Sequence, residues 1–93
     1  MKIYLAGKIS GDASYREKFA RVAQKFAGHE VLNPAELPEG MEKADYLRIC
    51  LAMIDCADMV LFLPDSRFSA GAKIEKDYCD YIGKAYWLME DEA

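Results

Sequence analysis

The chain has 93 residues, of which 53% are hydrophobic and 30% are charged, and its formal net charge is −4. This length allows a single domain, residues 1–93, around one hydrophobic core. The acidic balance argues against binding to a nucleic-acid backbone, and no apolar run approaches the roughly 20 residues of a membrane span. We therefore expect a soluble protein with no nucleic-acid or membrane partner, and the absence of a targeting signal favours the cytoplasm.

Neither the cysteines nor the histidine indicates a metal or cofactor site. Cys50, Cys56 and Cys79 are odd in number and include no C-x-x-C pair, so we interpret them as reduced, buried thiols. His29 follows Gly28 at an expected helix end, where it fits a turn. With one histidine and no cysteine cluster, a zinc site is disfavoured, and we expect no cofactor.

Short apolar runs alternate with amphipathic segments along the chain. Ile3–Ala6 is apolar and bounded by Gly7, which predicts a buried strand. A loop follows, and a capping-box pattern at Ser14 then predicts a helix with an apolar stripe that ends at about Gly28. Residues 30–32 form a short second strand.

The next segment predicts an irregular loop and a second helix. Asn33 ends the second strand, and the chain stays irregular to about residue 42. Asp45 is expected to cap a helix running to about Ile54, whose apolar face is so wide that it must be covered on two sides. In so short a chain the second cover can be another subunit, so we expect a homodimer or larger oligomer through the 45–54 helix.

The remaining segments complete an alternating pattern of strands and helices. Residues 59–63 are a continuous apolar run, typical of a parallel strand buried on both faces. A loop, a helix that Gly83 breaks and a strand over residues 85–88 follow. This order predicts an α/β three-layer sandwich, flavodoxin- or Rossmann-like, with a four-stranded parallel sheet in the order 2-1-3-4. Ligands of such sheets bind at the carboxyl ends of the strands, here at the loops 7–12, 33–42 and 64–70.

One carboxylate of the third predicted helix lies on its apolar face. At about 100° per residue, Glu75 falls in the middle of the face that Gly71 and Ile82 help to form. Burying an ionised carboxylate without partners costs several kcal/mol, on the order of the total stability of a small domain. Glu75 is therefore outside a helix, paired with a basic side chain, or exposed in a cleft where it acts. The last interpretation predicts an active site.

An ionised carboxylate at this position can act as a nucleophile. Helical side chains lean toward the N-terminus, so Glu75 can point at the strand ends, where the positive end of the helix favours its ionised form. Such a group can attack an anomeric carbon and form a covalent sugar intermediate. Asp65, just past the third strand, can protonate or orient the leaving group. Tyr4 either points toward this pocket or is a core aromatic.

Glycines and polar residues after the first strand form a candidate ligand loop. Gly7 and Gly11 let the backbone approach a ligand, and N–H groups there, with Lys8 and Ser10, can hold a phosphate or a hydroxyl group. The loop matches neither the P-loop nor the G-x-G-x-x-G pattern, and a glycine turn without function is the alternative. Asn33 can hydrogen-bond a base or a sugar.

Three segments of the chain resemble the nucleoside 2-deoxyribosyltransferase-like superfamily, namely Ile3–Gly7, Leu32–Pro34 and Ser69–Glu75. The late motif of that family is Gly-Thr-x-x-Glu, and its glutamate is the nucleophile. Gly71 and Glu75 match this motif, with Ala72 in place of the threonine. The family tyrosine that positions the nucleophile matches Tyr4. The chain is most similar to a small, functionally unassigned branch of the superfamily.

A hydrolase branch of the same superfamily cleaves deoxynucleoside 5′-monophosphates, and its phosphate-contacting serine matches Ser69. The resemblance implies a small-molecule nucleoside or nucleotide partner. Glu75 would attack C1′, the base would depart, and water or a second base would accept the sugar. Two other readings stay open, a nucleotide-binding module without catalysis and an oligomeric interaction protein. The phosphate loop of that branch is similar to Gly7, Lys8, Ile9, Ser10 and Gly11.

Overall fold

The structure is a computed structural model that describes residues 1–90. Strands alternate with helices along the chain, as the sequence predicted. Within residues 1–90, no helix has both the length and the apolar character needed to cross a membrane. The elements are β1 (Lys2–Ala6), α1 (Tyr15–Gln24), β2 (Glu30–Leu32), the 3₁₀ helix η1 (Pro34–Glu36), α2 (Lys43–Cys56), β3 (Met59–Phe62), the 3₁₀ helix η2 (Pro64–Phe68), α3 (Ala70–Ile82) and β4 (Tyr86–Leu88).

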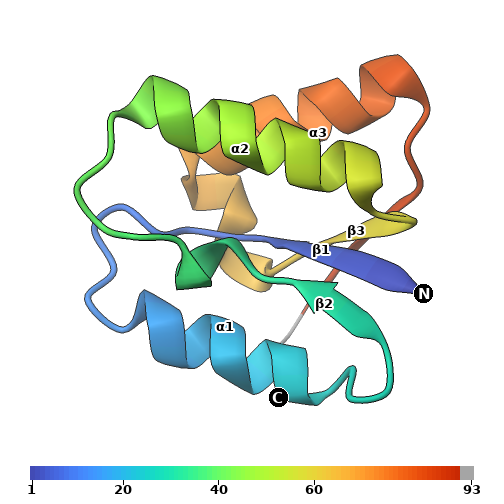
Figure 1. Cartoon of the computed structure of the whole chain (residues 1–93), viewed down its shortest axis with the longest axis horizontal. Helices are drawn as coiled ribbons and strands as arrows, with labels where there is room; N and C mark the ends of the chain where they lie inside the picture. Colours follow the sequence, from blue (N-terminus) through green and yellow to red (C-terminus); the bar gives the residue numbers. More distant parts are fainter. Residues whose placement is uncertain (91–93) are drawn as a thin grey trace.

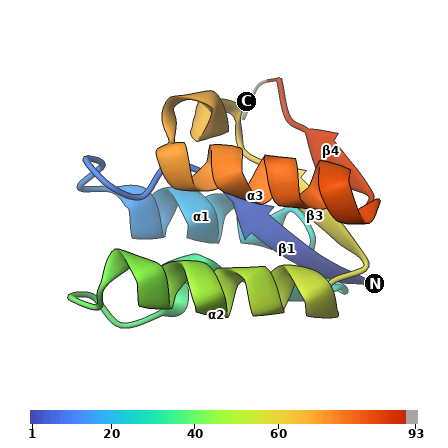
Figure 2. The ribbon, with the colours of Figure 1, turned by 90° about the horizontal axis from the view of Figure 1, so that it is seen from above.

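The strands form one four-stranded parallel sheet in the order β2-β1-β3-β4. This arrangement confirms the predicted fold class and strand order. α1 covers one face of the sheet, and α2 lies on the other face (Figure 1). α3 runs beside α2 in the same layer, as the view from above shows (Figure 2). The sheet is therefore the middle of three layers.

Successive residues of β1 and β3 face opposite layers, because side chains alternate along a strand. Toward α1 point the side chains that pack around Phe19 and Val22, namely Ile3, Leu5, Leu61 and Leu63. Toward α2 and α3 point the side chains that pack with Cys50, Ile54 and Cys79, namely Tyr4, Ala6, Val60 and Phe62. Tyr4 thus enters the layer that carries the third helix and its buried glutamate.

The helix boundaries correct two details of the sequence analysis. Ser14 precedes α1, but its side chain makes no capping hydrogen bond. Its backbone N–H instead donates to Asp12 Oδ1 at 2.9 Å, so Asp12 organises this turn. α2 begins at Lys43, and Asp45 lies in its first turn rather than before it. The first correction concerns the geometry of a side chain and the second the first residue of a helix, and residue type alone determines neither.

Gly7 follows β1 and packs closely against the core on the α1 side. A Cβ at residue 7 would lie 3.1 Å from the Cβ of Leu63 and 3.2 Å from the Cζ of Phe19. We expect Gly7→Ala to lower the free energy of unfolding by about 1–3 kcal/mol, because buried neighbours would have to shift. Urea denaturation measures this effect. The control is Gly71→Ala, where a Cβ would meet only the Ser69 Oγ at 3.9 Å. Equal losses in the two variants would contradict the close packing at residue 7.

Candidate functional site

A side-chain cap at the start of α3 fixes the helix that carries the predicted nucleophile. The Ser69 Oγ accepts a hydrogen bond from the backbone N–H of Ala72 at 3.1 Å, which is the contact of an N-cap residue. Glu75 lies just over a turn from the helix start and is 7% exposed. The neighbouring Ala72 and Cys79 are buried with it. A carboxyl group therefore does lie on the apolar face of α3.

Glu75 and Tyr4 form a buried hydrogen bond between α3 and β1. The Tyr4 hydroxyl donates to Glu75 Oε2 at 2.5 Å, and Tyr4 is 1% exposed. Among residues 1–90, no basic side chain forms an ion pair with Glu75. Of the alternatives that the sequence left open, Glu75 is neither outside the helix nor paired with a cation, and it is buried rather than exposed in a cleft. Its partner inside the protein is a tyrosine hydroxyl.

This environment changes the acidity of both groups. Burial raises the pKa of Glu75 to about 7, while the hydrogen bond from Tyr4 acts in the opposite direction. Burial, followed by the charge of Glu75, holds the pKa of Tyr4 well above its ordinary value, so Tyr4 remains a protonated donor. The carboxyl group of Glu75 is therefore about half ionised at neutral pH. Carboxyl groups perturbed in this way cluster at functional sites.

Cys50 of α2 is the third member of this buried group, and the sequence analysis did not select it. Its side chain packs in the same core cluster as Tyr4, and burial raises the pKa of its thiol, so the thiol stays neutral. Its position on the apolar stripe of α2 indicates that Cys50 is buried. That position does not predict which side chains of other elements it packs against. Cys79 is also buried, whereas Cys56 is exposed, which corrects the prediction that all three thiols are buried.

Asp65 lies in η2 and holds the loop that follows β1. Its Oδ1 accepts a hydrogen bond from the backbone N–H of Lys8 at 3.1 Å, and its Oδ2 accepts one from the ammonium group of Lys18. Both carboxylate oxygens are therefore engaged by the chain itself. A role for Asp65 in the departure of a leaving group stays a prediction.

The other predicted ligand-binding residues lie in the three loops that follow the strands. In the first loop Ser10 and Gly11 are exposed, and Gly11 has a φ of 81°, a region that favours glycine. Ile9 packs partly against the core on the α1 side. In the second loop Asn33 caps η1 by accepting a backbone hydrogen bond of 3.0 Å. In the third, Gly71 is exposed at the start of α3. Their contacts with a ligand stay predictions.

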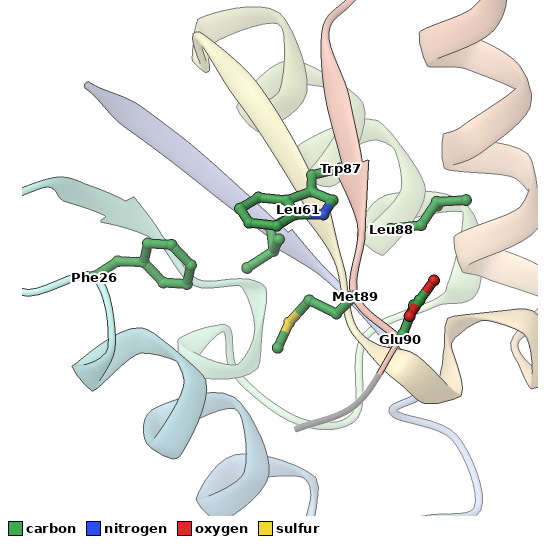
Figure 3. Close-up of a pocket in the computed structure, with 6 residues that line it drawn as sticks. All are labelled: Phe26, Leu61, Trp87, Leu88, Met89 and Glu90. Carbon is green, nitrogen blue, oxygen red and sulfur yellow. The ribbon is translucent and has the colours of Figure 1, made fainter. Parts of the chain in front are cut away.

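An apolar cavity of about 370 Å³ lies away from this group, on the α1 side of the sheet next to β4 (Figure 3). Trp87 lies over Leu61, and Met89 points toward Phe26, while Leu88 points to the opposite side, toward α3. None of the residues around Glu75 lines this cavity. In the described part of the chain, no group of three or more histidine, cysteine, aspartate or glutamate residues is placed to hold a metal ion.

Comparison with known proteins finds the same fold elsewhere. A family model described as "Domain of unknown function (DUF4406)" matches residues 1–87. Among solved structures, the chain is similar to a 2-deoxyribosyltransferase from the psychrotolerant bacterium Bacillus psychrosaccharolyticus, with a TM-score of 0.68 and 25% sequence identity. The match covers 95% of this chain and 71% of that enzyme, which is described as a biocatalyst for nucleoside synthesis. No curated protein matches the chain in sequence.

Proposed function

Because this chain belongs to the DUF4406 family and has a nucleoside 2-deoxyribosyltransferase-like fold, we propose that it cleaves or transfers the N-glycosidic bond of a nucleoside or nucleoside 5′-monophosphate. A fold hosts many activities, so the argument depends on the site. The observation that carries it is the buried hydrogen bond between Tyr4 and Glu75, with the Glu75 pKa raised to about 7.

In the proposed reaction Glu75 is the nucleophile. Its ionised carboxylate attacks C1′, the bond from C1′ to the base nitrogen breaks with its electron pair leaving on the base, and a sugar ester of Glu75 forms. Tyr4 positions the carboxylate through the hydroxyl hydrogen bond. Water or a second base then attacks C1′, the bond from C1′ to the Glu75 oxygen breaks to restore the carboxylate, and the departed base takes up the proton that the attacking group loses. Because both oxygens of Asp65 already accept hydrogen bonds, we infer that it assists by holding the ligand loop.

The loop after β1 is the proposed place of the 5′-phosphate. The backbone N–H groups of residues 9–11 form no hydrogen bond within residues 1–90, so they remain available as donors to an anion. The ammonium group of Lys8 and the hydroxyl groups of Ser10 and Ser69 would complete the donor set. Asn33 and Gly71 are the proposed contacts to base and sugar.

A nucleotide-binding module without turnover is the second candidate. The burial of Glu75, which is 7% exposed, favours it, because a sugar must reach the carboxylate before any attack. This candidate predicts thermal stabilisation by a nucleotide with no change in the nucleotide. Release of the base therefore separates the two candidates.

Part of the wide apolar face of α2 is free for a further contact. Ile54 is buried within the chain, whereas Leu47, Leu51 and Met53 are half-buried and Ile49 is 36% exposed. We propose that this helix joins a second copy of the chain in a homodimer or larger oligomer. The proposal is independent of the chemistry at Glu75.

Base release is the test of the proposed reaction. The protein is incubated with a panel of deoxynucleosides and their 5′-monophosphates, with and without an added free base, and the products are separated by chromatography. We expect a released or exchanged base with at least one substrate. Glu75→Gln should reduce the rate at least about 10³-fold, because it removes the nucleophile.

The matched control is Glu30→Gln, since Glu30 is exposed on β2, and it should react at the wild-type rate. No base release from any substrate, or equal rates for Glu75→Gln and the wild type, would contradict the proposed reaction. Exchange of bases without net hydrolysis would identify a transferase, and a free sugar product would identify a hydrolase.

A further inference from the structure

A buried lysine joins α1 to two of the loops at the proposed site. Lys18 lies near the start of α1 and is 9% exposed. Its Nζ donates hydrogen bonds to the backbone oxygen of Lys8 at 2.7 Å, to Asp12 Oδ2 at 2.6 Å and to Asp65 Oδ2. An ammonium group has three protons, so these three acceptors use its full donor capacity.

Two carboxylates make the burial of this charge possible. Burial alone lowers the pKa of Lys18, but the hydrogen bonds with Asp12 and Asp65 raise it above its ordinary value. Lys18 is therefore a cation held between two anions. Removing one partner of such a buried group leaves a charge without compensation, so the geometry of the cluster is strongly constrained.

The cluster fixes the loop after β1 at both ends. At the near end, the N–H of Lys8 is bound by Asp65 and its carbonyl oxygen by Lys18. At the far end, Asp12 binds Lys18 through Oδ2 and the backbone N–H of Ser14 through Oδ1. The exposed part of the loop lies between these two fixed points.

We propose that Lys18, through Asp65 and Asp12, is a positioning residue that holds residues 9–11 in the shape that binds the 5′-phosphate of the substrate. This inference rests on the proposed function, because the phosphate belongs to the proposed substrate. Lys18 does not touch the phosphate itself, since its three protons are donated to protein oxygens. Its removal should therefore weaken phosphate recognition and leave the recognition of an unphosphorylated sugar unchanged.

Lys18→Met tests the inference, because it removes the three hydrogen bonds and keeps an unbranched apolar side chain. The ligand is 2-deoxyribose 5-phosphate, which carries the phosphate of the proposed substrate without specifying a base. Its binding is followed by NMR through the amide signals of Ser10 and Gly11. We expect the Kd of Lys18→Met to rise about tenfold or more, as for the loss of a charge-assisted hydrogen bond. Lys43→Met, at the exposed first position of α2, is the control and should bind as the wild type does.

Two further measurements separate positioning from a general loss of structure. Titration with 2-deoxyribose should give the same weak response in all three proteins. In the wild type the Lys8 amide donates a hydrogen bond to Asp65. Hydrogen exchange of this amide should become faster in Lys18→Met only. If Lys18→Met does not fold, Asp65→Asn replaces it in the binding measurement. This variant removes one charge of the cluster and retains an oxygen acceptor, so we expect a smaller increase in Kd.

An unchanged Kd for 2-deoxyribose 5-phosphate in Lys18→Met, or no binding of it by the wild type, overturns the inference. An equal loss in Lys43→Met overturns it as well. The base-release experiment is separate from these outcomes. If the protein binds 2-deoxyribose 5-phosphate through residues 9–11 but releases no base, the proposed reaction is wrong and the role of Lys18 stands.

Discussion

Glu75→Gln is expected to be more stable than the wild type at pH 8 by about 3 kcal/mol and equally stable near pH 4.5. The pKa of Glu75 is about 7 in the folded protein and 4.5 for an ordinary glutamate, because burial penalises the charged form. The protonated group therefore favours the folded state at low pH. This contribution is lost between pH 4.5, above which the carboxyl group of the unfolded chain ionises, and pH 7, where the buried group ionises as well. Glutamine cannot ionise, so the free energy of unfolding of the variant does not fall for this reason as the pH rises.

Urea denaturation of the wild type and Glu75→Gln at several pH values between 4.5 and 8 measures this difference. All other titrating groups are common to both proteins, so the difference between the two curves reports Glu75 alone. Glu30→Gln, with an exposed carboxyl group, should follow the wild type across the range. Parallel curves for Glu75→Gln and the wild type would mean that Glu75 titrates normally and is not buried as described.

The same substitution is expected to abolish base release, so stability and activity should change in opposite directions. By the same linkage, the buried carboxyl group of Glu75 destabilises the folded state at neutral pH by about 3 kcal/mol. Improvement of stability by removal of a functional group is a common consequence of strained or desolvated active sites. Opposite effects on the two properties would distinguish a functional Glu75 from a structural one.

Tyr4→Phe is expected to raise the pKa of Glu75 further above 7 and to lower the free energy of unfolding at pH 8 by about 1–3 kcal/mol. The Tyr4 hydroxyl is the donor to Glu75 Oε2 at 2.5 Å, and its hydrogen bond counteracts the effect of burial on the carboxyl group. Without the hydroxyl, the burial penalty remains and the compensating donor is lost. The ionised fraction of Glu75 at neutral pH therefore falls.

Two measurements check the Tyr4 prediction. A carbon-detected NMR titration of the Glu75 carboxyl group gives its pKa in both proteins, and the pH profile of base release should show its acidic limb at higher pH in Tyr4→Phe. Tyr81→Phe removes a hydroxyl from a residue that is 92% exposed, and it should leave both profiles unchanged. An unchanged pKa in Tyr4→Phe would show that the hydroxyl does not influence the carboxyl group.

The fold could be predicted from the sequence because local spacing sets local structure. Alternation of short apolar runs and amphipathic segments predicted the parallel sheet and its order β2-β1-β3-β4. The position of Glu75 on an apolar helix face was also visible, since it depends only on the period of one helix. Details of the helix ends were less predictable, because the capping contact of Asp12 replaced the one expected for Ser14.

Contacts between distant segments could not be predicted in this way. The sequence placed Tyr4 in a strand but left open whether it was a core aromatic, and only the packing of α3 over β1 brings it to Glu75. The pattern of the sequence did not point to Lys18, whose buried ion pair joins α1 to Asp65, a residue that follows β3 in the chain. Periodicity determines which face of its own element a side chain occupies. The register of the sheet and the placement of the helices decide which side chain of another element that side chain contacts. They therefore decide that the pKa of Glu75 is raised by burial, whereas Asp65 forms an ion pair with Lys18.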